Sequence, residues 1–427
     1  MARYEPLKHV DDDYELGGAG GPRRADWTSG GGATLRWLKQ YGGWVVAGLF
    51  VLNALRGSSG SSRKTDCWDP YNALGYVYRP SNGSIRWIPY PPTSPSFSLS
   101  RSTEIESTLE PPPEALSYAP APYGDMLHRL DSEDGLKAME WARGKTIAFI
   151  GDSHDRFNVE YFCHQHSSAG AKLSVPHYHI KAHCRIPALD LTLVSWFHYG
   201  LAPESDSLPP SSASLDPPSD SDTSPSPTVG WNIPSLPTSH VNENPAPYAV
   251  EGRLREYWLP DTQTSKDEGG LGGKPDLIVL NSFFWDLRYF ALHAKHFRRP
   301  EALFAEERPL TYSELAWHRQ RVREYIELVR SAFPDVPIMF RLGQQKSSNR
   351  NEGNVAVFQL NESIRAVLRE LDVPVFEWAR LITGESHYND DQHLKQGAPA
   401  RLFGDMALFY LRKAVEGRWG VCEKPPR

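Results

Sequence analysis

The sequence predicts an α/β domain with a mainly parallel five-stranded sheet, and two observations point to this fold class. Short apolar runs typical of buried strands recur along the chain, at Thr146–Ile150, Ala188–Tyr199, Asp276–Asn281, Val336–Arg341 and Val373–Trp378. Segments with helical character lie between and around them, covering 132–142 with Ser132 as N-cap, the residues from Ser153 to Cys163, a stretch opened by a capping box at Thr311 and Glu314, 355–371, and 399–415. Strands that alternate with helices predict a parallel sheet covered on both faces.

The stretch from Lys145 to Cys163 organises the rest of the chain. Its first strand ends at Gly151, which allows a sharp turn before a helix, and Ser153 lies at that turn. This geometry exposes a hydroxyl at the C-terminal edge of a sheet, with a helix N-terminus aimed at whatever the hydroxyl attacks. Ser153 is therefore a candidate nucleophile, although helix N-caps are also very often serine.

A candidate base lies near the other end of the chain, because a serine hydroxyl is a poor nucleophile unless a base activates it. Asp390 precedes His393 by three residues, so its carboxylate can hold one ring nitrogen while the other faces the serine. The neighbouring Asp391 is the alternative partner of the ring. A surface histidine near a helix start is the competing interpretation of His393.

This pair of motifs resembles the SGNH/GDSL hydrolase superfamily, and within it the PC-esterase branch of polysaccharide and sialic acid O-acetyltransferases. The resemblance spans roughly residues 140–415, and Phe157 stands where plant members usually carry Asn. It is carried by Arg143-Gly144-Lys145, Gly151-Asp152-Ser153 with Arg156, Phe340-Arg341, and Asp390-x-x-His393 with Gly397, with a fainter trace at Cys67-Trp68-Asp69-Pro70. It implies a three-layer SGNH-like domain, placed at 132–420, that works through a triad of Ser153, His393 and Asp390.

The resemblance also suggests further site residues. Acyl transfer needs donors for the oxyanion, and the superfamily supplies them from the backbone of the serine, here Ser153, and from a glycine and an asparagine that fall at Gly200 and Asn281. For these two residues, structural capping is an equal alternative. Arg156 and Arg341 either bind a polar substrate or brace the site through a carboxylate, and we favour substrate binding.

Composition limits the partners and marks segments outside the core. With 46 Lys and Arg against 52 Asp and Glu, the net charge is −6 and shows no basic footprint, so nucleic acid is not an expected partner. The 36 Pro and 33 Gly indicate extended or disordered segments. We expect a disordered tail over 1–40 and a disordered insertion over 201–229. Between the apolar run and the folded domain we expect a stem with an aromatic and Pro-rich lead-in over 56–131, in which 91–122 is an extended linker and the aromatic stretch 66–90 packs on the folded domain.

The one strongly apolar run without charge covers 41–55. As a helix it would rise roughly 22 Å, which is short for a membrane span; a cleaved signal peptide and a buried helix are the alternatives. Sequons at Asn82 and Asn361 and all four cysteines follow it. We expect a signal-anchor, with residues 56–427 luminal, in a single-pass type II membrane protein of the Golgi or another secretory membrane.

The four cysteines allow three pairings. Cys163 lies in the serine helix and Cys184 in the segment that feeds the second strand, so these two are expected to pair. Cys67 and Cys422 would then form the other pair. Histidines around Cys163 and Cys184 suggest zinc ligands, but their spacing matches no common structural site, so no metal is expected.

The function predicted from these residues is acetyl transfer to carbohydrate hydroxyls through an acyl-enzyme. Hydrolysis by the same triad is the alternative, and a non-catalytic glycan-binding module is a further one. No resident cofactor is implied, although a donor such as acetyl-CoA could serve as substrate. Trp231 and Trp285 could stack on sugars, but aromatic core packing is the commoner role.

Overall fold

The computed structural model describes residues 68–79, 85–90, 111, 113–203, 247–296, 299–303, 308–347, 354–385 and 387–421. Residues 66–427 belong to one compact unit. Several predicted features lie outside the described residues: the tail over 1–40, the apolar run over 41–55, Cys67, Cys422, Asn82, Trp231 and nearly all of the insertion over 201–229.

A seven-stranded mixed sheet forms the centre of this unit, in the order β4-β5-β6-β3-β7-β8-β9. The five predicted strands are present and parallel to one another: β6 (Leu191–Phe197), β3 (Thr146–Gly151), β7 (Leu277–Leu280), β8 (Ile338–Arg341) and β9 (Val375–Phe376). The prediction of five strands is wrong in number. An antiparallel hairpin, β4 (Lys172–His177) and β5 (Lys181–Ile186), extends the sheet beyond β6.

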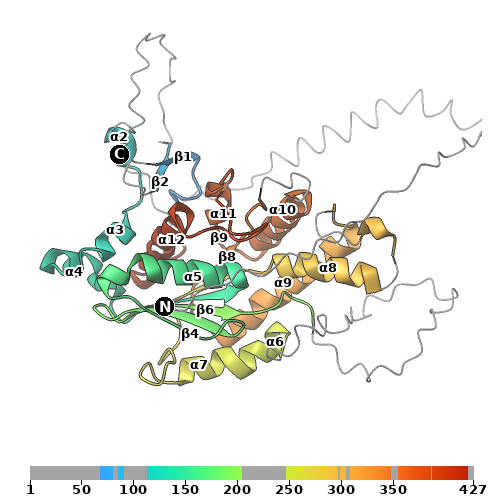
Figure 1. The fold of residues 1–427 in the computed structure, drawn as a ribbon, viewed down its shortest axis with the longest axis horizontal. Helices are drawn as coiled ribbons and strands as arrows, with labels where there is room; N and C mark the ends of the chain where they lie inside the picture. The colour runs from blue at the N-terminus through green and yellow to red at the C-terminus, as the bar shows by residue number, and fades with distance from the viewer. Residues whose placement is uncertain are drawn as a thin grey trace, which may run out of the picture. The chain divides into compact units, whose positions relative to one another are not determined.

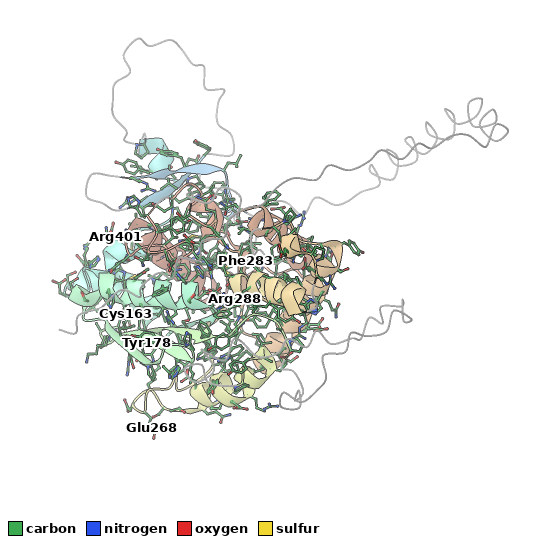
Figure 2. All side chains as sticks on the ribbon, turned by 45° about the vertical axis from the view of Figure 1, so that its right-hand side comes forward. Cys163, Tyr178, Glu268, Phe283, Arg288 and Arg401 are labelled. Carbon is green, nitrogen blue, oxygen red and sulfur yellow. A yellow bond between two sulfur atoms is a disulfide. The ribbon has the colours of Figure 1, made fainter. Side chains whose placement is uncertain are left out.

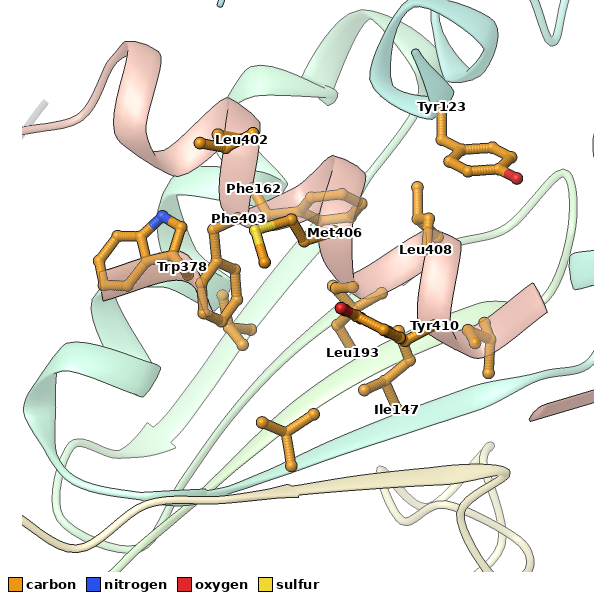
Figure 3. Packing of buried hydrophobic residues seen from close by; sticks show 14 of the residues in the cluster. Tyr123, Ile147, Phe162, Leu193, Trp378, Leu402, Phe403, Met406, Leu408 and Tyr410 are labelled. Carbon is orange, nitrogen blue, oxygen red and sulfur yellow. The ribbon is translucent and has the colours of Figure 1, made fainter. Parts of the chain in front are cut away.

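Helices cover both faces of the sheet, as expected. Along β3, Ile147 and Phe149 enter one core with α5 (Ser153–Gln165) and α12 (Ala398–Val415). Ala148 and Ile150 enter another core with α8 (Phe284–His296), α9 (Tyr312–Ala332) and α10 (Asn354–Glu370). The alternation follows from the two-residue period of a strand. Figure 3 shows the first core, where Phe403 and Met406 of α12 meet Phe162 of α5 above the sheet.

The remaining elements follow in chain order (Figure 1). They are β1 (Gly75–Tyr78), β2 (Arg86–Pro89), α2 (Pro113–Leu116), α3 (Tyr123–Leu127), α4 (Glu133–Met139), α6 (Val250–Arg253), a π turn (Leu254–Trp258), α7 (Leu259–Gln263), α8 (Phe284–His296), α9 (Tyr312–Ala332), α10 (Asn354–Glu370) and α11 (Trp378–Leu381), with short 3₁₀ turns at Glu140–Ala142, Ser167–Ala169 and Glu301–Leu303. Two predicted caps are confirmed. Ser132 accepts the N–H of Gly135, and Thr311 with Glu314 forms the complete capping box.

The aromatic lead-in packs against α12, on one face of the sheet. Tyr71 is 2% exposed and meets Phe409 edge to face, with ring centroids 5.2 Å apart. The hydroxyl of Tyr410 donates to both carboxylate oxygens of Asp69 at 3.2 and 3.0 Å. Residues 68–79 and 85–90 thus contribute side chains to the same core as the sheet.

The predicted pairing of Cys163 with Cys184 is confirmed. The disulfide joins α5 to β5, with the two Cα atoms 5.3 Å apart, and Cys163 is labelled in Figure 2. Both cysteines are buried.

The predicted localisation needs correction. Among the residues that the structure describes, no helix has the length and apolar character needed to cross a bilayer. The assignment as a single-pass type II membrane protein therefore has no support in the structure, and the run over 41–55 on which it depended lies outside the described part.

Candidate active site

The serine turn forms where β3 ends. Every residue of β3 is buried, and Asp152 caps α5 by accepting the backbone N–H of His154 at 2.9 Å. Ser153 is the first residue of the helix. A Cβ at Gly151 would overlap the carboxylate of Asp155 and lie 3.1 Å from the Cβ of Asn281, so only glycine fits between strand and helix.

The structure brings Ser153, His393 and Asp390 together. The Ser153 Oγ lies 2.7 Å from His393 Nε2, and His393 Nδ1 lies 2.7 Å from Asp390 Oδ2. Three residues from two widely separated segments therefore form the hydrogen-bonded chain that a nucleophile, a base and an orienting carboxylate require.

Asp390 also holds the backbone of the loop. Its Oδ1 accepts the N–H groups of Gln392 and His393, each at 2.8 Å. Partial burial raises the pKa of Asp390, but the hydrogen bonds from the His393 ring and from the two backbone groups outweigh burial and lower that pKa overall. Asp390 is thus the ring partner in this structure, and Asp391 instead accepts the N–H of Ser347 through its backbone carbonyl at 2.9 Å.

Arg341 lies beneath the site rather than at its surface. Its Nε and one terminal nitrogen donate to the two carboxylate oxygens of Asp155 at 2.7 and 2.8 Å, and its side chain is 1% exposed. The bidentate pair ties the end of β8 to the first turn of α5. This favours bracing over the predicted substrate contact.

Arg156 is held in a similar way. One terminal nitrogen donates to the carbonyl of Tyr178 at 3.0 Å, the Nε lies 3.2 Å from a carboxylate oxygen of Glu160, and the guanidinium lies over the Phe157 ring at 4.6 Å. The side chain is about 10% exposed. Arg156 therefore supports the turn between β4 and β5, and the exposed ring of Tyr178 above it faces solvent (Figure 2).

The two expected oxyanion donors have partners within the protein. The Gly200 N–H donates to His198 Nδ1 at 3.1 Å, and the Asn281 side-chain N–H donates to the Arg341 carbonyl at 2.9 Å. Both residues lie near the serine turn, because His198 donates its backbone N–H to the Gly151 carbonyl and Asn281 lies against Gly151. The structure thus places them beside the site without aiming either hydrogen at the serine.

Several residues at the site were not anticipated. Asp286, fully buried, accepts the N–H of Leu201 at 2.7 Å and bonds Ser282 and His318. The Gly200 φ of +86° suits glycine, and a Cβ there would meet the Asp286 carboxylate. His154 and Asp155 belong to the serine motif itself but were not expected to have a role. One signal for Asp155 was available in the sequence, because an arginine buried at the end of a strand, such as Arg341, requires a carboxylate partner.

Three further expectations concern Asn361, Trp285 and a metal site. Asn361 lies in α10, and its side-chain amide forms two hydrogen bonds with the backbone of Gly343. The Nδ2 group donates to the Gly343 carbonyl at 2.8 Å, and Oδ1 accepts the Gly343 N–H at 3.0 Å. That geometry opposes glycosylation of Asn361, which needs an accessible amide. Trp285 packs edge to face against Tyr199, with ring centroids 5.0 Å apart. In the part of the chain that is described, no three His, Cys, Asp or Glu side chains could hold a metal ion together.

Comparison with known proteins adds little. No family model matches the chain, and no curated protein does. Among solved structures the chain is similar to an acetyl xylan esterase from the rumen bacterium Butyrivibrio proteoclasticus, with 14% identity and a TM-score of 0.29. The match covers 66% of this chain and 65% of that enzyme, which is less than two thirds of its length. So distant a likeness carries no argument about the reaction, and it gives no support to the PC-esterase branch in particular.

Proposed function

We propose that this protein is a serine-dependent esterase that removes acyl groups, acetyl above all, from carbohydrate hydroxyls. The observation that carries the proposal is the unbroken chain from Ser153 Oγ through His393 to Asp390, with both links at 2.7 Å. A non-catalytic glycan-binding module has no need of such a chain.

The chemistry follows from this geometry. His393 Nε2 takes the proton of the Ser153 hydroxyl while Oγ attacks the ester carbonyl, and Asp390 stabilises the imidazolium that results. The backbone N–H of Ser153, at the start of α5, faces the developing oxyanion. The imidazolium then gives its proton to the departing sugar oxygen, which leaves an acyl-serine.

The acceptor in the second step decides the class of enzyme. The side chains of His393 and Asp390 are 22% and 56% exposed, so water reaches the base. Water that loses a proton to His393 Nε2 attacks the acyl-serine and releases acetate. This openness makes hydrolysis the outcome that the site supports best.

Transfer to a sugar hydroxyl is the second candidate, and one observation favours it. Tyr178 presents a 59% exposed ring above Arg156, one helical turn beyond Ser153. An aromatic face of this kind can stack on a sugar ring. An acceptor held there would compete with water by its effective concentration.

The test of the nucleophile is labelling with a fluorophosphonate. The wild-type protein should be modified at Ser153, while Ser153→Ala and His393→Ala should each lose labelling and esterase activity and still unfold at the wild-type temperature. The double variant should be scarcely worse than either single variant, because a triad acts as a unit. Full activity of Ser153→Ala would refute the proposal.

A single-turnover experiment separates the two acceptors. Acetylated Ser153 is formed with an activated acetate ester and mixed with rising concentrations of xylan oligosaccharides or sialosides. Acetate release that no glycan changes identifies an esterase. Formation of acetylated sugar at the expense of acetate identifies a transferase.

A further inference from the structure

A second histidine lies against the ring of His393. The His154 ring is sandwiched between those of His393 and Phe284, with centroids 4.5 Å away on each side and interplanar angles of 24° and 26°. Phe157 closes a further side of His393 edge to face, at 5.0 Å and 72°. A cavity lined by His154, Phe157 and His393, together with Gln344 and Trp378, has a volume of about 10 Å³, roughly the least that one water molecule requires. The back of the His393 ring is therefore packed.

The two nitrogens of His154 connect the serine helix to the loop that carries His393. Nδ1 lies 2.9 Å from Asp152 Oδ1, in the cap of α5, and Nε2 lies 3.3 Å from the carbonyl of Gln392, the residue before His393. The same carbonyl accepts an N–H of Gln344 at 3.2 Å. The peptide bond that leads into His393 is thus contacted from two sides by buried groups.

Arg341 closes this network from below. It donates to the Gln344 side-chain oxygen at 3.4 Å and lies 3.8 Å from Asp152, in addition to its bidentate pair with Asp155. Strand β8, the cap of α5 and the 389–393 loop are consequently joined through one set of buried polar side chains. His154 is the member of that set which touches the His393 ring.

The charges around His154 fit a neutral ring, which has a single N–H and therefore donates either to Asp152 or to the Gln392 carbonyl, while the other nitrogen makes only a packing contact. Burial lowers the pKa of His154 and outweighs the attraction of Asp152; the charges of His393 and Arg341 lower it further. A neutral ring stacked on His393 does not oppose the positive charge that the base acquires when it takes the serine proton. A protonated neighbour would oppose it.

We propose that His154 is a positioning residue for His393: its ring fixes the plane of the base by stacking, and its place between Asp152 and the Gln392 carbonyl sets the position of the loop that carries the base. The proposal rests on the proposed function of Ser153 and His393. Figure 2 labels Phe283, the residue that precedes Phe284 and α8.

Three substitutions separate the two contributions. His154→Phe keeps a stacking ring and loses both nitrogen contacts; His154→Asn keeps a donor near the Nδ1 position and loses the ring; His154→Ala loses both. The measurement is the rate constant for fluorophosphonate labelling of Ser153, with kcat and KM for an activated acetate ester. We expect His154→Ala to lower the labelling rate and kcat by roughly tenfold to a hundredfold with KM unchanged, because a small displacement of a base costs about that much. The Phe and Asn variants should fall between.

His166 provides the matched control. It is a histidine of the same buried class, 4% exposed like His154, and it follows the last residue of the same helix, where it packs on Phe162 and His128. His166→Ala should loosen α5 without changing the labelling rate of the folded protein. Equal losses in both alanine variants, or a wild-type rate and kcat in His154→Ala, would overturn the positioning role.

A second measurement keeps this inference distinct from the proposed function. The proton in the hydrogen bond between His393 Nδ1 and Asp390 should give a low-field NMR signal in the wild type and in His166→Ala, and it should shift or broaden in His154→Ala. This readout needs no catalysis. Absence of labelling in the wild type would refute the proposed function, whereas an unchanged NMR signal in His154→Ala would refute the positioning of His393.

Discussion

Asp390 uses each of its carboxylate oxygens for a different task. Oδ2 faces the His393 ring, while Oδ1 accepts the N–H groups of Gln392 and His393. One side chain therefore fixes both the tautomer of the base and the backbone that carries it. Asp390 and His393 are only three residues apart in the sequence, which explains why this contact was predictable from spacing alone.

Asp390→Asn should separate these tasks, because the amide oxygen can still accept from the backbone while the orientation of the ring is lost. We expect the rate of acylation of Ser153 to fall by about 10²-fold to 10⁴-fold, with little change in stability. The depressed pKa of Asp390 means that it stays ionised through the ordinary acid range, so its titration should not appear in the rate profile above pH 5. Stopped-flow labelling checks this, and Asp391→Asn, at wild-type rate, is the control.

The pair of Arg341 and Asp155 makes a different prediction. Both side chains are almost completely buried, so removing one partner leaves a charge without compensation. Arg341→Met should lower the free energy of unfolding by about 3–5 kcal/mol, and the double variant with Asp155→Leu should recover part of that loss. Urea unfolding followed by fluorescence measures both. Loss of activity at wild-type stability would instead indicate that Arg341 contacts substrate. Glu140→Gln, in an exposed ion pair with Arg143, should leave the unfolding curve unchanged.

At the scale of single elements, the disulfide between Cys163 and Cys184 fastens the serine helix to the hairpin extension of the sheet. The two cysteines are 21 residues apart in sequence, a separation for which a cross-link typically contributes about 3 kcal/mol. Replacing both by alanine should lower stability by about that amount and leave the labelling of Ser153 intact at low temperature. Unfolding in the presence and absence of reductant gives the same comparison on the wild type. Equal stability in both conditions would contradict it.

The elements that sequence predicted best are those with the strongest apolar signal. Four of the five parallel strands lie inside the sheet and are mainly apolar, as β7 shows with its four buried residues, while β9 forms one edge. The hairpin β4–β5 at the other end of the sheet was missed because its exposure alternates along each strand, and lysine, histidine and proline dilute the pattern. An alternating pattern that contains so few apolar residues cannot be distinguished in the sequence from the pattern of a loop.

The residues of the site also fall into those that the sequence predicted and those that it did not. Ser153 and the Asp390–His393 spacing were visible because each motif is local in sequence. The contacts of Asp155 with Arg341, 186 residues away, and of His154 with Gln392, 238 residues away, depend on the finished fold. The presence of arginine and aspartate in a sequence does not reveal whether they contact each other or a substrate. The sequence therefore left both roles of Arg341 open, and its pair with Asp155 favours bracing.

At the scale of the whole unit, stability should respond to pH through two groups that share a cavity of about 260 Å³ between α3, α5 and α12. Burial lowers the pKa of His166 to about 3, and burial raises the pKa of Asp405 to about 7. His166 favours folding above pH 6.5. It loses that contribution as pH falls, because its ring gains a proton in the unfolded chain and not in the folded protein. Asp405 favours folding at low pH and loses that contribution as pH rises through about 7, the pKa of its carboxyl in the folded protein.

The two slopes oppose each other between about pH 4 and 6.5, so they nearly cancel in the wild type. Relative to wild type, His166→Phe should make the free energy of unfolding decrease as pH rises across this window. Asp405→Asn should make it decrease as pH falls. Each change should be on the order of 1 kcal/mol per pH unit. Denaturant titrations at pH 4.5, 5.5 and 6.5 measure the slopes, and identical slopes in all three proteins would contradict the assignment.

The separation of 240 residues between Ser153 and His393 has a consequence for biosynthesis. Synthesis runs from the N-terminus, so the serine helix leaves the ribosome long before its base has been translated. A nascent chain therefore carries an unactivated serine, and it gains reactivity only when the 389–393 loop docks on α5. Under the proposed function, stalled or prematurely terminated chains would be inert towards esters, however well their first strands had folded. The time at which fluorophosphonate reactivity appears during translation would therefore report when the sheet is complete.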